Sequence, residues 1–422
     1  MRFIHMADIH FDSPFTVLTD KRDFGAKRRL EQREVFKKAI EYISKEKIPY
    51  LFIAGDLYDQ DYIRESTIEF INNLFKTVPN TKIFISPGNH DPYLKNSFYN
   101  TFNWNENVTI FKDEIKRIEL EEVDIYGYGF TDFYCSNSKV EEIEIKNKEK
   151  INILLVHGAL DSSKAIDTQY NPISTNKLKE IGFDYIALGH VHKRTEENKY
   201  NFIYPGSIIS FGFDELGEHG ILDVKIEKNN LENKKIINNL INNKNEIINN
   251  NLIKNNNEEK ITENKLNKNN YLNNSEKNNE NNFNNLENNN LNYKNKTKID
   301  FVKLDNRVFV EKEIDISEMN SEEEVIEKLN QIEENENTFL KIILIGVRNI
   351  EVNEKEICKL ATNKNILKVK NRTETKYDFD QLATQNNLKG IFVKKMIKKL
   401  EEENYNQEEI KRAIEIGLQS FE

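Results

Sequence analysis

Five short motifs in the first half of this 422-residue chain carry side chains that bind divalent metal ions. They supply two carboxylates, one amide and four imidazoles, a mixed oxygen and nitrogen set large enough to hold two ions. The seven candidate ligands are Asp8, His10, Asp56, Asn89, His157, His190 and His192. Two cations held together lower the pKa of a bound water and screen an anionic phosphate. The predicted chemistry is therefore dinuclear metal-assisted hydrolysis of a phosphate ester.

The position of each motif fits this chemistry better than a chance distribution does. Asp8 and His10 are two residues apart, so their side chains leave an extended chain on the same side. Asp56 follows the apolar run 51–54 and a glycine that allows a tight turn, a placement suited to a carboxylate that bridges two cations. Asp59 is better placed to orient a histidine than to bind metal. A single histidine at a strand end is more often structural, and it is the ordered set of five motifs that favours a metal site.

Apolar runs directly before the motifs predict the strands that position them. The predicted strands are 3–6, 50–54, 82–85, 123–128, 151–156, 185–188 and 201–204, and helical patterns occupy 28–45 and 65–76. This alternation predicts an α/β sandwich. Ligands of such folds gather outside the carboxyl ends of the strands, which is where every motif lies.

The composition changes along the chain and divides it into parts. All 7 prolines and 12 of the 15 glycines precede Ile221, which indicates a compact, turn-rich core over residues 1–228. Asn then fills 27 of the 60 positions from 231 to 290, without the apolar periodicity that could offset ordering entropy. We expect residues 229–297 to be a disordered insertion between two paired strands. The second of these, 298–306, is predicted to be the final core strand.

Beyond the insertion, the patterns predict a small α/β cap domain over residues 307–375. Strand-like runs at 307–316 and 340–347 flank a helix that opens on a capping box formed by Ser321 and Glu324. Residues 376–422 contain two amphipathic helices. Two interpretations of these helices remain open, packing on the cap domain and docking of a partner.

Charge and cysteine content exclude several classes of protein. A net charge of −10 argues against nucleic-acid binding through overall basic charge, so any contact with a polyanion must be local or mediated by metal. One basic cluster could contact a nucleic-acid backbone or could pair with nearby carboxylates; it consists of Lys21, Arg22, Lys27, Arg28, Arg29 and Arg33. The two cysteines have no metal or redox spacing, and no long apolar run is present. We expect a cytoplasmic protein without a membrane segment.

The motifs resemble those of the calcineurin-like metallophosphoesterase superfamily across residues 1 to about 227. Their details are similar to the SbcD/YhaO-type DNA repair nucleases. The residues that carry the resemblance are MRFIHMADIHFDSPF at the start, then IAGDLYD, ISPGNHD, LLVHG, ALGHVHKR and IYPGSIISFGFDELGEHG. The last of these segments, 203–220, is the most specific for the subfamily. Phosphoprotein phosphatases would carry Asp-Arg-Gly after the second motif, whereas Gln60 and Asp61 follow Asp59 here.

The resemblance implies a four-layer α/β/β/α sandwich and two bound ions, with Mn²⁺ the expected metal. Asp56 would bridge the two ions. By this resemblance, the first ion would be held by Asp8, His10, Asp56 and His192, and the second by Asp56, Asn89, His157 and His190.

His90 is not needed as a ligand in this scheme. It would donate to the developing charge or protonate the leaving oxygen, with Asp59 fixing its orientation. Some relatives have a histidine at the position of Asp59, so this sequence departs from them there. His5, inside the first strand, is expected to be a core residue, and His219 is assigned no catalytic role.

The resemblance also implies DNA as substrate, bound without sequence specificity, and an SMC-like ATPase with a coiled coil as partner, docked on the terminal helices. We expect a metal-dependent DNA nuclease, either an exonuclease or a single-strand endonuclease. A phosphodiesterase for small nucleotides or phosphoesters, and a non-catalytic scaffold, are the alternatives. The sequence leaves open whether the chain forms a homodimer.

Overall fold

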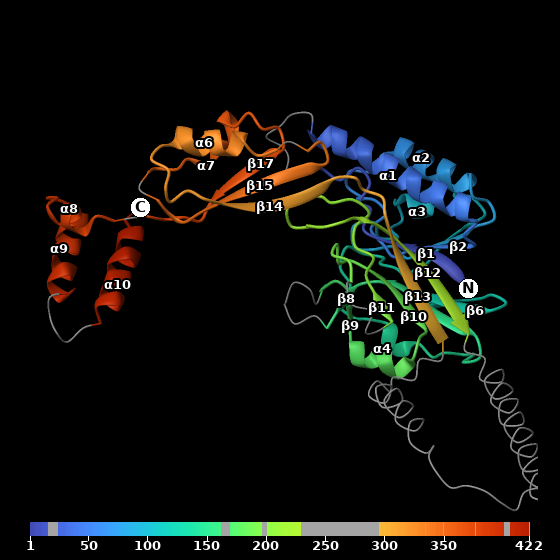
Figure 1. Cartoon of the computed structure of the whole chain (residues 1–422). Coiled ribbons are helices and arrows are strands. Elements are labelled where there is room, and N and C mark those ends of the chain that lie inside the picture. Colours follow the sequence, from blue (N-terminus) through green and yellow to red (C-terminus); the bar gives the residue numbers. More distant parts are fainter. Residues whose placement is uncertain are drawn as a thin grey trace, which may run out of the picture. The chain divides into compact units, whose positions relative to one another are not determined.

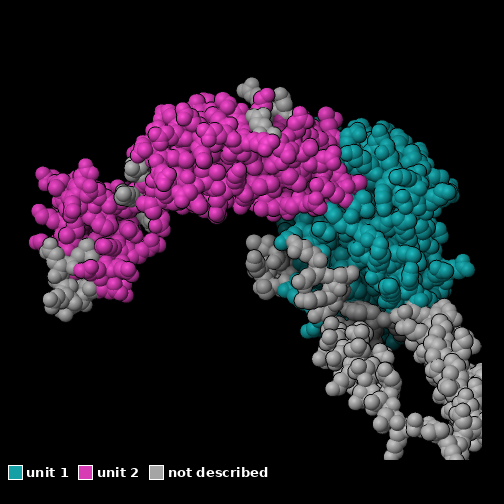
Figure 2. All heavy atoms as spheres, viewed as in Figure 1, with its two compact units in different colours: residues 1–13, 32–208, 220–302 teal, residues 14–31, 209–219, 303–422 magenta. Residues whose placement is uncertain are grey.

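The computed structural model describes residues 1–15, 24–161, 169–195, 201–228, 295–333, 335–348, 350–375, 377–400 and 406–421 (Figure 1). The chain divides into two compact units (Figure 2). Unit 1 consists of residues 1–13, 32–208 and 220–302, and unit 2 of residues 14–31, 209–219 and 303–422. The Asn-rich tract lies outside the described residues. The prediction that it is disordered therefore concerns residues that the structure does not describe. None of the described helices is both long and apolar enough to cross a membrane.

Unit 1 contains a six-stranded sheet in the order β13-β12-β1-β2-β3-β4. β1 to β4 run parallel, and β12 is antiparallel to β1. The carboxyl ends of β1, β2 and β3 therefore share one edge, directly before Asp8, Asp56 and Asn89. The final strand, β13, begins at residue 295 rather than at the predicted 298. The strand bounds are β1 (Arg2–Met6), β2 (Tyr50–Ile53), β3 (Lys82–Ile85), β4 (Val108–Ile110), β12 (Gly220–Lys228) and β13 (Asn295–Lys303).

A five-stranded sheet, in the order β11-β10-β7-β6-β5, forms the other half of unit 1. All of its pairings are parallel except that of β5 with β6. The strands are β5 (Lys116–Glu119), β6 (Val123–Gly127), β7 (Ile151–His157), β10 (Tyr185–Gly189) and β11 (Phe202–Ile203). β7 ends on His157, and His190 directly follows β10. The His190 N–H donates a 2.9 Å hydrogen bond to Asp8 Oδ1, which joins this end of the second sheet to the end of β1.

The two sheets pack face to face, and helices cover their outer faces. Phe3 and Phe52 of the first sheet share one apolar cluster with Ile153 and Tyr185 of the second. The covering helices are α1 (Phe24–Glu46) and α2 (Glu65–Lys76) over the first sheet and α4 (Thr175–Ile181) over the second (Figure 1). These four layers confirm the predicted α/β/β/α sandwich.

The predicted elements of the sandwich are present. All seven predicted strands occur, with ends that differ from the prediction by at most one residue, and helix 65–76 matches fully. Several short elements were not predicted, because three or four residues carry too little periodicity. Besides β4 and β5, they are α3 (Phe98–Thr101), the 3-10 helix η2 (Val140–Glu142), and the paired strands β8 (Ala159–Leu160) and β9 (Pro172–Ile173).

The middle of unit 2 is a three-stranded parallel sheet, β14-β15-β17, with two helices on one face. Its core joins Ile342 and Leu344 of β15 to Val325 and Leu329 of α6. The Ser321 hydroxyl accepts the Glu324 N–H, as the predicted capping box requires, but the Glu324 carboxylate reaches back to the N–H of Asn320. The elements are β14 (Val308–Asp315), α6 (Glu322–Asn330), β15 (Thr338–Ile345), α7 (Glu354–Leu360) and β17 (Ile366–Asn371), with a strand pair β16 (Val347–Arg348) and β18 (Glu374–Thr375).

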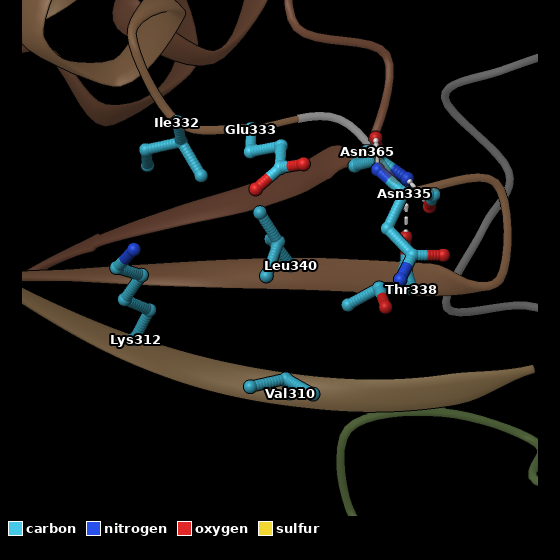
Figure 3. Close-up of a pocket in the computed structure, with 8 residues that line it drawn as sticks. All are labelled: Val310, Lys312, Ile332, Glu333, Asn335, Thr338, Leu340 and Asn365. Carbon is cyan, nitrogen blue, oxygen red and sulfur yellow. Dashed lines mark hydrogen bonds between the residues drawn. The ribbon is translucent and has the colours of Figure 1, made fainter.

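A pocket of about 430 Å³ opens on this sheet (Figure 3). Val310 and Lys312 of β14 line one side of it, and Glu333 lies opposite. The Asn365 amide donates to the carbonyl groups of Asn335 and Thr338 and so fixes one end of the pocket. The lining includes no histidine and none of the predicted site residues.

Three helices close the chain and form a separate apolar core. They are α8 (Phe379–Ala383), α9 (Leu388–Leu400) and α10 (Gln407–Gln419). Val393 of α9 packs with Ile414 and Leu418 of α10, and all three are fully buried. This cluster includes no residue of the cap core. The two predicted terminal helices are thus present and pack on each other, and partner docking remains a proposal.

Candidate metal centre

The candidate ligands lie in turns whose backbone is strained. Asp8, His10 and Asp56 have positive φ angles of 52°, 51° and 52°, and His190 has a φ of 108°. Residues other than glycine seldom adopt such angles, and they persist where surrounding contacts hold them. Here the N–H groups of Ile9 and His10 both donate to the carbonyl oxygen of Asp56 at 2.8 Å. The first two motifs therefore form one cross-linked turn pair at the edge of the first sheet.

Asp8, His10 and His192 form the first cluster of potential ligand atoms. His10 Nε2 lies 3.1 Å from His192 Nε2. Two imidazole nitrogens this close can share a proton or bind a common cation. The Asp59 carboxylate accepts a 2.8 Å hydrogen bond from His10 Nδ1, so Nε2, which faces His192 and Asp56, is the nitrogen that would bind metal.

Asp56 belongs to two further groups of potential ligand atoms, one with His10 and His90 and one with Asp8 and His157. Its Oδ2 atom is 3.6 Å from His10 Nε2 and 3.3 Å from His157 Nε2, while its Oδ1 atom accepts the His90 N–H at 2.9 Å. Asn89 Oδ1 lies 3.0 Å from His157 Nε2. His157 Nδ1 donates to the Ala54 carbonyl oxygen at 2.8 Å, so this ring also directs its other nitrogen into the site. A carboxylate oxygen central to two imidazoles has the position of a bridging ligand.

Asp8 provides the test of whether these residues fit a cation. Its side chain is fully buried, and Oδ2 has no hydrogen-bond partner among the described residues. A buried carboxylate oxygen without a partner is strongly unfavourable. Burial accordingly raises the pKa of Asp8, although His192 and His157 oppose this. A metal ion would supply the missing partner, and the donor set of carboxylate, amide and imidazole fits divalent metals.

The charges of Asp56 and His157 are tied together. Burial opposes ionisation of Asp56, yet the neighbouring His157 lowers the pKa of Asp56 well below its ordinary value. Burial likewise opposes protonation of His157, but Asp56 raises the pKa of His157 to about 9. Asp56 is therefore an anion that requires a positive partner, and a cation can replace the imidazolium in that role.

His190 lies beside these clusters without belonging to any of the three carboxylate and histidine groups found among the described residues. Its ring centroid is 5.3 Å from that of His157 and 5.2 Å from that of Tyr170. Burial and the charge of His157 lower the pKa of His190 to about 4. The imidazole is therefore neutral, which is the form that binds metal.

His90 and Asp59 form the pair that the sequence predicted. Asp59 Oδ1 lies 3.1 Å from His90 Nδ1, and the His90 side chain is 51% exposed whereas that of Asp59 is 8% exposed. Burial opposes charge on both groups, but their hydrogen bond raises the pKa of His90 to about 9 and lowers that of Asp59. Asp59 also holds His10, which the sequence did not predict. One carboxylate thus orients both a candidate ligand and the candidate proton donor.

Asp91 is a functional residue that the sequence analysis quoted within a motif but gave no role. It is fully buried, and its carboxylate accepts the N–H groups of Asp56, Leu57 and Gly88. The Tyr99 hydroxyl donates to it as well, at 2.6 Å. These bonds fix the turn that presents Asp56. The sequence feature that could have indicated this role is the position of Asp91 as the last residue of the Gly-Asn-His-Asp motif.

Two histidines lie outside the centre. His5 is fully buried and contacts the Tyr185 hydroxyl and the Leu188 carbonyl oxygen, which confirms its assignment to the core. His219 is 5% exposed, with Nε2 on the Glu215 carbonyl oxygen.

For Arg28, the structure decides between the two alternatives that the sequence left open for the basic cluster. The Arg28 side chain is fully buried and donates to the carboxylates of Asp305 and Glu31, both at 2.8 Å. The alternative that the cluster pairs with nearby carboxylates holds for this residue. Arg33 is also engaged, because it donates to the Thr67 hydroxyl at 2.6 Å. Lys21 and Arg22 lie outside the described residues.

Comparison with known proteins agrees with this geometry. Residues 1–194 match the family described as calcineurin-like phosphoesterase. A Bacillus subtilis protein named uncharacterized metallophosphoesterase YhaO is 26% identical over 231 residues, which are 52% of this chain and 56% of that protein. The chain thus spans little more than half the length of this relative.

Two proteins whose names identify them as subunits of the nuclease SbcCD also match. The one from Staphylococcus epidermidis is 26% identical over 274 residues, 56% of this chain and 69% of that protein. The one from Staphylococcus saprophyticus is 24% identical over 268 residues, 54% of this chain and 67% of that protein. The match to the calcineurin-like phosphoesterase family covers residues 1–194, which contain all nine predicted site residues.

Proposed function

We propose that the chain is a metal-dependent DNA nuclease that hydrolyses phosphodiester bonds, as an exonuclease, a single-strand endonuclease or both. The observation that carries the proposal is the buried pair of carboxylates formed by Asp8 and Asp56, which lies against His10 and His157. One oxygen of this pair, Asp8 Oδ2, has no hydrogen-bond partner among the described residues. Two relatives named as nuclease subunits support a nucleic acid as the substrate, and DNA is part of our proposal.

The proposed ligand assignment follows the family resemblance, and the grouping of Asp8 with His10 and His192 and of Asp56 with His157 supports it. Asp8, His10, Asp56 and His192 would hold one divalent ion, and Asp56, Asn89, His157 and His190 the other. We propose Mn²⁺ for both ions. Bound there, the two ions would supply charge to screen the phosphate and an activated water.

His90 would supply the proton that the leaving oxygen requires. Its exposed ring can reach a bound ester, while Asp59 keeps Nδ1 occupied and turns Nε2 outward. Asp59 is then a positioning residue, because its contacts are with His90 and His10 rather than with the ester.

The biological setting is a further part of the proposal. We propose that the protein acts in DNA repair with an SMC-like ATPase, docked on α9 and α10. Lys394, Lys395, Lys398 and Lys399 on α9 would face the solvent or that partner. We also propose a cytoplasmic location.

The test is an assay of the purified full chain with Mn²⁺ on labelled single-stranded and double-stranded DNA and on a small chromogenic phosphodiester. We expect His90→Ala to lower the rate of DNA cleavage by about 100-fold or more, since acid catalysis contributes about 10²–10⁴-fold. Lys82→Ala is the control, because Lys82 is exposed at the opposite end of β3.

Two outcomes would contradict parts of the proposal. Turnover of the small ester without cleavage of either DNA would favour the small-molecule phosphodiesterase. Normal DNA cleavage by both His90→Ala and Asp56→Ala would show that the centre itself is wrongly assigned.

A further inference from the structure

A pocket beside His90 is lined mainly by aromatic side chains. It has a volume of about 250 Å³, and Asn89 and His90 form its inner wall. The aromatic lining consists of Tyr62, Phe133, Tyr134 and Tyr170. Pockets for drug-sized ligands usually measure roughly 300–1,000 Å³. This one has room for a single planar group next to the candidate proton donor.

The aromatic side chains are more exposed than packing alone would require. Tyr134 is 59% exposed, Tyr62 54% and Phe133 37%. Single exposed apolar residues are common on protein surfaces, but a group of them around one pocket marks a binding site. No aliphatic side chain contributes to the lining, so the pocket offers flat aromatic faces and polar edges.

The rings form a path from the metal centre to the surface. The ring of Tyr170 is tilted by 37° to that of His190 at 5.2 Å, and the ring of Tyr134 by 32° to that of Tyr170 at 6.0 Å. The backbone fixes this arrangement, because the Cys135 N–H donates to the Gln169 carbonyl oxygen at 2.7 Å and the Asn171 N–H to the Cys135 carbonyl oxygen at 2.6 Å. The two tyrosines are thus held in place before any ligand arrives.

Polar groups lie at the rim of the same pocket. Gln60 lines it, and its Oε1 atom is buried without a hydrogen-bond partner among the described residues. Its backbone N–H donates to the His90 carbonyl oxygen at 2.9 Å, which ties Gln60 to the candidate proton donor. An unpaired amide oxygen calls for a donor, and every nucleobase, thymine included, carries at least one N–H group that a glutamine side chain can accept.

Tyr134 also borders a second pocket, of about 230 Å³. Lys139, Ser136 and Asn137 line that pocket, and Lys139 pairs with Asp113. Tyr134 thus has one pocket that leads to His90 and one that leads away from it. A ring in this position can lie between two successive groups of an extended polymer.

We propose that Tyr134 and Tyr170 form a stacking platform for a nucleobase next to the scissile phosphate, with Gln60 at the edge of the base. This inference deepens the proposed function and rests on it. A base can reach the platform only when it is unstacked from its neighbours. The preferred substrate is therefore single-stranded DNA or a frayed end, without preference for sequence, because every base has an aromatic face.

The experiment compares a single-stranded thymidine oligonucleotide with an abasic oligonucleotide of equal length. Cleavage is measured with Mn²⁺, and binding is measured by fluorescence anisotropy without metal. Stacking contributes about 1–3 kcal/mol per base, so Tyr134→Ala should lower the preference for the base-bearing strand by about 5-fold to 150-fold. Tyr134→Phe keeps the ring and should restore the preference.

The outcomes separate this inference from the proposed function. If the wild type cleaves DNA but Tyr134→Ala keeps the full preference for the base-bearing strand, the platform is overturned and the nuclease stands. If the wild type cleaves neither strand, the nuclease fails, and binding decides the platform. Tighter binding of the base-bearing strand that is lost in Tyr134→Ala supports the platform, and equal binding of both strands by the wild type overturns it.

Discussion

Replacing Gly189 with alanine tests whether the two sheets of unit 1 must meet closely to build the metal centre. A Cβ atom on Gly189 would lie 1.7 Å from the Ala54 carbonyl oxygen and 2.9 Å from His157 Nδ1. The Ala54 carbonyl oxygen is also the group that orients His157. Real Cβ contacts under 3.0 Å essentially do not occur, so the end of β10 or of β2 must move by roughly 1 Å.

The displacement gives two magnitudes. Overpacking of a filled site destabilises by about 1–3 kcal/mol. At roughly 2–4 °C per kcal/mol, we expect Tm to fall by about 2–12 °C. The same movement separates His157 and His190 from Asp56 and Asp8, and a misplacement of about 1 Å can lower a rate by about 100-fold. Activity and Mn²⁺ affinity should therefore fall far more than stability.

Thermal unfolding and calorimetric titration with Mn²⁺ measure the two effects. Gly25→Ala is the matched control, because its Cβ would meet its nearest neighbours at an ordinary 3.7 Å in helix α1. Gly182→Ala is a second control, in which nothing lies within 4 Å but φ is +81°, so the backbone is strained without crowding. Equal Tm and equal Mn²⁺ affinity for Gly189→Ala and Gly25→Ala would refute the argument from close approach.

Three further predictions address stability. Removal of metal by a chelator should lower Tm and added Mn²⁺ should restore it, since a ligand at 100 times its Kd stabilises by about 2.7 kcal/mol; a Tm that ignores both treatments would contradict a metal centre. Arg28→Met should destabilise by about 3–5 kcal/mol in urea unfolding, because it leaves the buried Asp305 carboxylate unpaired, and the double variant Arg28→Met/Asp305→Leu should recover much of this loss. Hydrogen bonds from Arg2 and Tyr42 lower the pKa of Asp223 against the effect of burial. Ionised Asp223 therefore stabilises the folded protein above its ordinary pKa of 3.8, and this contribution is lost as the pH falls through the lower pKa that Asp223 has in the folded state. Asp223→Asn should therefore flatten the fall in Tm between about pH 5 and 3, and an unchanged slope would count against the assignment.

The strands that carry the motifs were predictable because each is a short and predominantly apolar run. β2 and β3 end in three consecutive buried residues, and β7 is buried throughout. Such runs have no alternation to misread, and the glycines after them mark where they stop. The strand β5, Lys116–Glu119, was not predicted because it is an edge strand in which polar residues alternate with a half-buried isoleucine.

The site was predictable as a set of residues and not as a geometry. Residue types and strand ends indicated which side chains would meet. Which of them form hydrogen bonds with one another depends on the conformation of turns, which no local sequence pattern specifies. Asp59 is the example, because its contact with His10 joins two segments 49 residues apart. Arg28 is the opposite case, since a basic residue among charged neighbours gave no sign of full burial against Asp305.

Three unfavourable features coincide where the two sheets meet. Asp8 and Asp56 adopt positive φ angles, both carboxylates are buried, and Asp8 Oδ2 has no hydrogen-bond partner among the described residues. Each would destabilise an ordinary core. A bound cation would remove the electrostatic penalties together, because it would give both carboxylates a partner at turns that are already cross-linked. His90 lies in a group with His10 and Asp56, but its side chain is 51% exposed, so it is the member of that group that could reach an ester bound at this edge.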